Sequence, residues 1–225
     1  MIRIERRSAS DKVRRELKGF GAVGIIALLV IVLVHPASIG GLLVLAWAKW
    51  SQTPYPEVGF SRPRSWIMTV SSGVAFGAAF KVVMKSVVMP LLGAPAINQT
   101  YHYLAGNSAA LPSMIFTLTA GAGFGEETVF RGFLYERCRK IFGRALTATF
   151  ATIIITSAIF ASAHFVDQGL PGVEQALFTG AAFGALYILA GQLWLPMAAH
   201  IAFDLTALAM IYWDLEPKFA HLFFK

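Results

Sequence analysis

Charged side chains are scarce in this chain. Only 14% of its 225 residues are charged, whereas 56% are hydrophobic. A soluble domain has about 25% charged residues, so this composition leaves more apolar surface than a soluble core can bury. We therefore expect an integral, multi-pass membrane protein.

Cysteine is almost absent, since Cys138 is alone. A single cysteine excludes an internal disulfide and a multi-cysteine metal site. No Ser/Gly-rich linker, low-complexity tract or repeat of about 20 to 50 residues divides the chain. We expect one domain over residues 19–225, preceded by a basic tail over residues 1–18 that includes Arg3, Arg6 and Arg7.

Several catalytic and nucleotide-binding motifs are also missing. The chain has no HExxH, no GxSG-type serine motif, no GxGD aspartate motif and no P-loop. The glycines of the segment 121–125 do not have the spacing of a dinucleotide-binding loop. These absences exclude the enzyme classes whose chemistry depends on those motifs.

The excess of positive charge, a net +7, lies in short clusters between apolar runs rather than along one face. This distribution is typical of membrane orientation and predicts no nucleic-acid partner. The basic tail and the clusters in residues 49–65 and 137–144 are expected to face the cytoplasm. Residues 93–110 carry no charged side chain and suit the outer side.

Apolar runs of about 18 to 25 residues have the length of a transmembrane helix, and most of the apolar runs in this chain are of about that length. Their number predicts an all-α bundle of about seven transmembrane helices, within a range of six to eight. A short polar loop is expected at residues 167–171. The runs are 20–34, 39–47, 66–92, 111–135, 145–165, 173–190 and 193–212.

The first two runs are short and are separated by His35 and Pro36. Proline removes a backbone donor and bends or ends a helix, so one long kinked helix and a tight helical pair both fit. The pair returns the chain to the side that it left. The positive-inside rule favours the pair because it places residues 49–65 in the cytoplasm.

Some glycines have the spacing at which transmembrane helices approach one another closely. Glycine is also frequent, with 20 in the chain, so chance spacing is the competing interpretation. The pairs are Gly73/Gly77, Gly121/Gly125 and Gly180/Gly184.

Ionisable residues inside the apolar runs gather in the second half of the chain. A charge at membrane depth costs several kcal/mol unless it is paired or faces a wet cavity, so such residues indicate a functional site. The candidate site residues are Glu126, Glu127, Arg131, His164, His200 and Asp204.

Each candidate also has a purely structural interpretation. Glu127 and Arg131 are four residues apart, lie on one helix face and can form an ion pair. His200 and Asp204 have the same spacing, so Asp204 can hydrogen-bond the imidazole. These local pairs leave Glu126 without an obvious partner, and an unpaired buried acid is costly. Glu126 is therefore the carboxylate expected to be free for chemistry.

A carboxylate with imidazoles nearby suits activation of water for attack on a carbonyl, and two versions are open. In one, Glu126, His164, His200 and Asp204 bind a divalent metal such as zinc that keeps a position open for water. In the other there is no cofactor: Glu126 deprotonates water with help from His164, while His200 and a partner stabilise the oxyanion.

The motifs Glu126–Gly132 (EExxxR), Phe160–His164 (FxxxH) and His200–Asp204 (HxxxN/D) together resemble the CPBP family of intramembrane proteases. This family includes the type II CAAX prenyl proteases and the bacterial Abi, or bacteriocin-processing, proteins. The resemblance covers residues 111–212. It implies a helical membrane fold around a hydrophilic cavity and an endopeptidase that cuts a membrane-associated peptide or protein, here in a bacterial inner membrane.

Carried over by position, the resemblance gives each residue a role. Glu126 would activate water with His164, Glu127 and Arg131 would support the site, and His200 with Asp204 would polarise the carbonyl. The prenyl proteases have asparagine where this chain has Asp204, and an ionised aspartate cannot donate a hydrogen bond. Asp204 is then protonated, orients His200 or ligates a metal.

Two functions from other classes compete with a protease. One is a non-catalytic immunity or scaffold protein of the same fold, and the other is an ion or proton pathway through the acidic cavity. The positions of the two histidines along their predicted helices raise a further question. His164 lies about 27 Å and His200 about 10 Å from the predicted starts of their helices, so they meet only if the helices tilt, break or begin elsewhere.

Overall fold

The computed structural model describes residues 2–224, with side chains from Ser10 onward. The side chains of Arg3, Arg6 and Arg7 in the predicted basic tail thus lie outside the described residues. Residues 2–224 contain helices and no strand. The main helices are α1 (Ile2–Lys18), α2 (Ala22–Leu33), α3 (Ala37–Ser51), α4 (Trp66–Val83), α6 (Leu111–Phe116), α7 (Tyr135–Phe142), α8 (Leu146–Ala163), α9 (Phe165–Ala190), α10 (Trp194–Tyr212) and α11 (Glu216–Ala220).

Shorter helical segments extend or connect these helices. Two of them, η2 and η5, are π-helical and continue α4 and α6 without a break. The segment α5 is a short α-helical turn, and the remaining three are single 3-10 turns. They are η1 (Tyr55–Val58), η2 (Met84–Val88), α5 (Met89–Leu91), η3 (His102–Leu104), η4 (Ser108–Ala110) and η5 (Thr117–Leu134).

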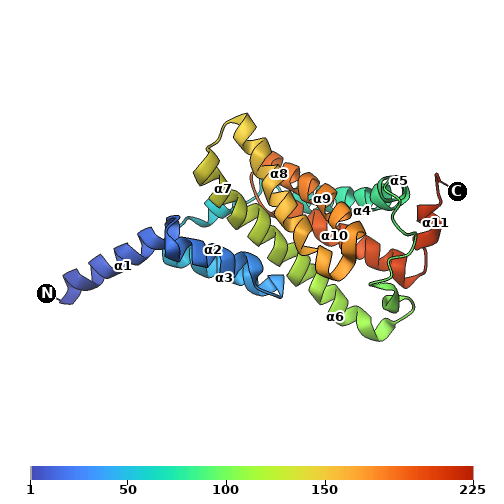
Figure 1. Cartoon of the computed structure of the whole chain (residues 1–225), viewed down its shortest axis with the longest axis horizontal. Coiled ribbons are helices and arrows are strands. Elements are labelled where there is room, and N and C mark those ends of the chain that lie inside the picture. Colours follow the sequence, from blue (N-terminus) through green and yellow to red (C-terminus); the bar gives the residue numbers. More distant parts are fainter. Residues whose placement is uncertain (1, 225) are drawn as a thin grey trace.

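One long helix, made of α6, η5 and α7, runs diagonally through the molecule (Figure 1). It covers residues 111–142, which is about 48 Å at 1.5 Å per residue and longer than a bilayer core of about 30 Å. The predicted helix over residues 111–135 is confirmed, and the basic cluster after it is helical as well. A π-helix of this length is unusual, and π-helical turns are frequent at functional sites.

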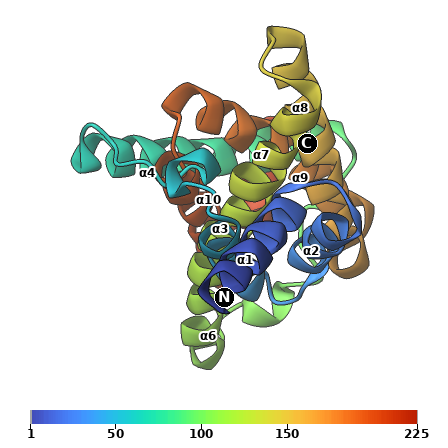
Figure 2. The same ribbon diagram turned by 90° about the vertical axis from the view of Figure 1, so that its left-hand side faces the viewer.

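The other long helices surround the long helix in pairs (Figure 2). Helix α4 packs along α10, and α8 packs along α9. A Cβ atom built on Gly77 would collide with the backbone of Ala199, and one on Gly180 would lie 2.9 Å from Cβ of Ser157. The missing side chains therefore permit both close approaches. Gly121 differs, because its nearest neighbour would be Thr117 on its own helix.

Helices α2 and α3 form the predicted helical pair rather than one kinked helix. They are joined through a cis His35-Pro36 bond and lie side by side in both views (Figures 1 and 2). Helix α3 packs on η5, where a Cβ atom on Gly125 would collide with the backbone of Ala37. The start of α3 is therefore held against the helix turn that carries the acidic pair.

The predicted number of about seven transmembrane helices is not confirmed. Among the described residues, four helices are long and apolar enough to cross a membrane: 66–91, 146–163, 165–190 and 194–212. A fifth is reached if the bent pair 10–18 and 22–33 counts as one span. Helices α2 and α3 are too short to qualify singly, and η5 carries charges in its middle. The chain is an integral membrane protein with fewer clear spans than its apolar runs indicated.

The polar loop predicted at residues 167–171 is wrong in part. Helix α9 begins at Phe165 and covers this segment, with Pro171 inside it. Its helical path is interrupted at Gly169, where φ is 62°. This left-handed conformation favours glycine, so the polar residues form a kinked helical turn instead of a free loop.

Candidate active site

A cavity of about 400 Å³ opens between the long helix, α4, α9 and α10. Its wall also includes residues 94–101, which follow α5, and His35 and Pro36 between α2 and α3. Four of the six predicted site residues line it: Glu126, His164, His200 and Asp204. The remaining two, Glu127 and Arg131, lie behind this wall in the protein interior.

Glu127 is the buried centre of the polar cluster, with a fully buried side chain. Its Oε1 atom accepts a hydrogen bond from Nη1 of Arg131 at 2.8 Å and lies 2.7 Å from Nδ1 of His200. The ion pair with Arg131 that the sequence predicts is therefore present. It links the long helix to α10 through His200 and so fixes the imidazole in place.

The orientation of His200 follows from this contact. Because an ionised carboxylate only accepts hydrogen bonds, Nδ1 of His200 carries the hydrogen that points to Glu127. The other ring nitrogen, Nε2, then faces Asp204 Oδ2 at 3.5 Å and Glu126 Oε2 at 3.9 Å. Three carboxyl groups thus surround one buried imidazole ring.

Glu126 and Asp204 differ from Glu127 in their access to the cavity. Their side chains are 22% and 20% exposed, whereas that of Glu127 is fully buried. The 3.9 Å between Glu126 and His200 is too long for a direct hydrogen bond but allows one water to contact both groups. Glu126 is therefore the carboxylate of the acidic pair that can meet a reactant.

His164 ends α8 and is half-buried. Its Nδ1 atom lies 3.0 Å from the carbonyl oxygen of Phe160, one turn earlier. A carbonyl can only accept, so Nδ1 carries the hydrogen and Nε2 is left for the cavity. Within the described residues, no hydrogen bond or ion pair joins His164 to Glu126 or His200.

Aromatic rings contact Arg131 and both histidines. The Arg131 guanidinium carbon lies 4.4 Å from the ring centroid of Phe160 and 5.7 Å from that of Phe183. Phe160 also contacts both histidines, with centroids 4.7 Å from His164 and 6.1 Å from His200. One fully buried phenylalanine therefore separates the two imidazoles and sets their spacing across the cavity.

Two lysines of the α4–η2 segment line the opposite wall. Lys81 Nζ donates to Gln175 Oε1 at 2.8 Å, and Lys85 Nζ donates to Glu216 Oε1 at 2.6 Å. Glu216 also accepts from the backbone N–H of Asn98. No pattern in the sequence indicated that Glu216, which lies beyond the last apolar run, would reach Lys85.

The segment before η3 forms a further part of the cavity wall. Thr100 donates to the backbone carbonyl of Asp167 at 3.1 Å, and Tyr101 lines the cavity wall. Burial raises the pKa of the Tyr101 phenol, and the carboxylate of Asp167 acts in the same direction. Tyr101 is therefore a neutral hydroxyl that can donate a hydrogen bond into the cavity.

The predicted metal ligands are not gathered into a recognisable metal site. Among the described residues, no group of three or more His, Cys, Asp or Glu side chains is arranged to hold a metal ion. The hydrogen bonds of His200 to Glu127 and of His164 to a backbone carbonyl each occupy one ring nitrogen and leave the other toward the cavity. A divalent metal held by Glu126, His164, His200 and Asp204 therefore stays a prediction, and no step is derived through a metal.

The structure thus brings five predicted residues into one connected cluster: Glu126, Glu127, Arg131, His200 and Asp204. His164 lines the same cavity but stands apart behind Phe160. His164 and His200 lie at different distances from the starts of their helices, α8 and α10. This difference does not keep them apart, because both line the same cavity.

Comparison with known families gives one match. Residues 108–206 match the family described as type II CAAX prenyl endopeptidase Rce1-like, and all six predicted site residues fall within this segment. The comparison with curated proteins returned no match, and neither did the comparison with solved structures.

Proposed function

Because residues 108–206 match the Rce1-like family of type II CAAX prenyl endopeptidases, we propose that this chain is an intramembrane endopeptidase that uses a water activated by Glu126. The family is a protease family, which supports hydrolysis as the class of reaction.

The observation that carries the proposal is the different environment of the two adjacent acids, Glu126 and Glu127. Glu127 is fully buried and occupied by Arg131 and His200, whereas Glu126 is partly open to the cavity beside Nε2 of His200. A structural ion pair would not need a second carboxylate at this depth. A general base needs an unpaired carboxylate near a water and an oriented imidazole, which is the arrangement found.

The proposed reaction uses three groups on the cavity wall. Glu126 takes a proton from a water placed between it and His200, and the resulting hydroxide adds to the carbonyl carbon of the peptide bond. His200, when protonated at Nε2, donates to the developing oxyanion. The proton on Glu126 then passes to the leaving amine, directly or through His164, and the C–N bond breaks.

Asp204 has a positioning role in this proposal. Its Oδ2 atom lies 3.5 Å from His200 Nε2, so it competes with the substrate oxygen for the same donor. An ionised Asp204 would hold the imidazole in the plane required before substrate enters. This role suits an aspartate, which accepts hydrogen bonds, where the prenyl proteases have an asparagine.

The proposed substrate is a membrane-associated peptide or protein that reaches the cavity from the bilayer. The positive-inside rule, applied to the basic segments 49–65 and 137–144, supports an orientation in which the N-terminus and the starts of α4, α8 and α10 lie in the cytoplasm. In a bacterial cell this corresponds to the inner membrane. The cavity-lining residues of α4 and α8 then lie toward the opposite ends of these helices, whereas His200 lies in the first half of α10.

The test compares membrane peptides from cells that express the natural chain or Glu126→Gln, by mass spectrometry. Asp167→Asn is the matched control, because Asp167 is an exposed acid near the cavity and is not placed in the reaction. We expect at least one product to disappear with Glu126→Gln and to persist with Asp167→Asn, at equal amounts of protein in the membrane. Unchanged peptides would overturn the proposal.

Two further outcomes would support another class of function. If cells that express the double variant, Glu126→Gln with His200→Ala, show the same phenotype as cells that express the natural chain, the chain is a non-catalytic immunity or scaffold protein. If the natural chain conducts protons or ions in liposomes, the cavity is a pathway. Metal content and chelator sensitivity of the purified protein separate a metal enzyme from the glutamate mechanism proposed here.

A further inference from the structure

A second pocket, of about 480 Å³, lies at the other end of the long helix. It is lined by residues of η1, α7 and the facing ends of α8 and α9, and it shares no residue with the cavity of the candidate site. Arg139 on its wall is 13 residues beyond Glu126, about 20 Å along the helix. Its cationic residues are Arg139, Lys140 and Arg144.

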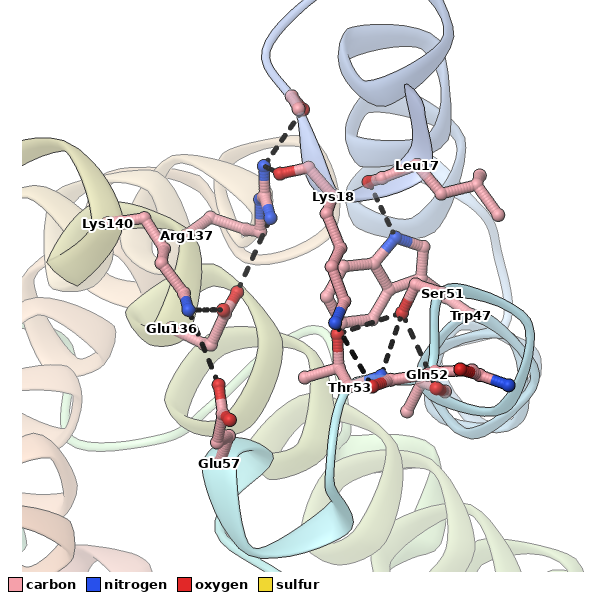
Figure 3. Close-up of polar contacts among 12 residues, drawn as sticks. Leu17, Lys18, Trp47, Ser51, Gln52, Thr53, Glu57, Glu136, Arg137 and Lys140 are labelled. Atoms are coloured by element: carbon pink, nitrogen blue, oxygen red, sulfur yellow. Dashed lines mark hydrogen bonds and ion pairs between the residues drawn. The ribbon is translucent and has the colours of Figure 1, made fainter. Parts of the chain in front are cut away.

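The charges of this pocket are unequally paired. Lys140 Nζ lies 3.4 Å from Glu57 and 3.6 Å from Glu136, so it lies between the two acids of the pocket (Figure 3). Burial raises the pKa of Glu136, which lies outside the candidate membrane spans, and so disfavours its charged form. Arg139 and Arg144 have no carboxylate within ion-pair distance among the described residues. The pocket therefore keeps two uncompensated guanidinium groups.

The inner wall of the pocket is rigid and aromatic. Tyr135 and Tyr187 are both buried, and their rings meet edge to face with centroids 5.2 Å apart. The Arg139 guanidinium carbon lies 5.9 Å from the centroid of Tyr135. A guanidinium held over a ring is positioned for two parallel hydrogen bonds to a phosphate or carboxylate.

The surroundings of the pocket distinguish a lipid from a soluble anion. The pocket lies where α8 begins and α9 ends, at the face that carries the basic clusters. Large apolar side chains stand exposed beside it: Leu146 is 71%, Phe150 58% and Leu189 82% exposed. In a membrane protein these side chains face acyl chains, so a lipid could place its phosphate in the pocket and its tails along α8 and α9.

We propose that this pocket binds the phosphate of an anionic lipid headgroup through Arg139 and Arg144. Basic pockets between helix ends on the cytoplasmic side are suited to such headgroups. The site is independent of the proposed protease reaction, because none of its residues touches the cavity of the candidate site.

The test measures the thermal stability of the purified protein in a neutral detergent with three additives: phosphatidylglycerol, phosphatidylcholine and inorganic phosphate. Native mass spectrometry counts the lipids that remain bound. The variant is Arg139→Gln with Arg144→Gln, and Arg144→Gln alone is the milder second variant. The control is Arg62→Gln with Arg64→Gln, which removes the same charge from exposed positions outside the pocket.

We expect phosphatidylglycerol, and not phosphatidylcholine, to stabilise the natural chain and the control. The double variant should weaken this binding by roughly tenfold for each arginine lost, the usual worth of a hydrogen bond to a charged group. Equal stabilisation by inorganic phosphate would identify a free anion as the source of the same chemistry and overturn the lipid assignment. Equal weakening in the control, or no stabilisation at all, would overturn the site itself.

Discussion

His200 Nδ1 lies 2.7 Å from Oε1 of Glu127, the same oxygen that receives the guanidinium of Arg131. One buried carboxylate therefore connects two helices and fixes the tautomer of a histidine on the cavity wall. Orientation of an imidazole by a buried acid is a recurrent feature of hydrolytic sites. Here the orienting acid, Glu127, and the acid proposed to activate water, Glu126, are neighbours in the sequence.

Glu127→Gln is expected to destabilise the fold rather than to act on the reaction alone. It leaves the buried guanidinium of Arg131 without a counter-charge, which typically costs about 3–5 kcal/mol. Thermal unfolding in detergent measures this loss. The double variant Glu127→Gln with Arg131→Met removes both charges and should recover most of the stability. A Glu127→Gln protein as stable as the natural chain would show that the pair is not structural.

His164→Ala is expected to slow cleavage while leaving stability nearly unchanged. The side chain is half-buried, and among the described residues its one polar contact is a local backbone carbonyl, so the fold loses little. Loss of a proton-transfer group typically lowers the rate by about 10²–10⁴-fold. The measurement is the initial rate on a substrate found by the peptide comparison, with Ser162→Ala as the control at the same helix end. Equal rates would remove His164 from the reaction.

Glu216→Gln is expected to release the C-terminal helix from the cavity wall. Lys85 would keep its charge in a buried site without a carboxylate, and the Asn98 backbone N–H would lose an ionised acceptor. Hydrogen exchange should become roughly a hundredfold faster in α11 and in residues 94–101, corresponding to local opening. Lys218→Gln is the matched control, because Lys218 is exposed on the same short helix. Unchanged hydrogen exchange in the Glu216 variant would show that Glu216 does not hold α11 against the cavity wall.

Gly77→Ala is expected to weaken the packing of α4 on α10. The added methyl group would meet the backbone of Ala199, which cannot move aside as a flexible side chain can. Overpacking of this kind costs about 1–3 kcal/mol. Gly121→Ala serves as the control, since its Cβ atom would lie 3.7 Å from Thr117 and in ordinary contact. Thermal unfolding of both variants gives the comparison, and equal stability would show that the glycine is not required for close packing.

The sequence predicts some elements well and others poorly, for physical reasons. The helix over residues 66–92 and the one that starts at Leu111 were predictable, because long apolar runs and local prolines act over a few residues. The number of spans was not. An apolar run indicates that a segment avoids water. It does not indicate whether lipid or the interior of the helix bundle surrounds the segment, as the short helices α2 and α3 illustrate.

The sequence by itself determined that this protein lies in a lipid bilayer, that it is helical and which polar residues it carries. Composition and spacing along one helix are local properties. The pairing of Glu127 with Arg131 belongs to this group. Tertiary structure alone decided that His200 shares the same oxygen, that Glu126 faces the cavity and that Glu216 reaches Lys85. These contacts join helices far apart in the chain, and their geometry is set by packing, which no local pattern encodes.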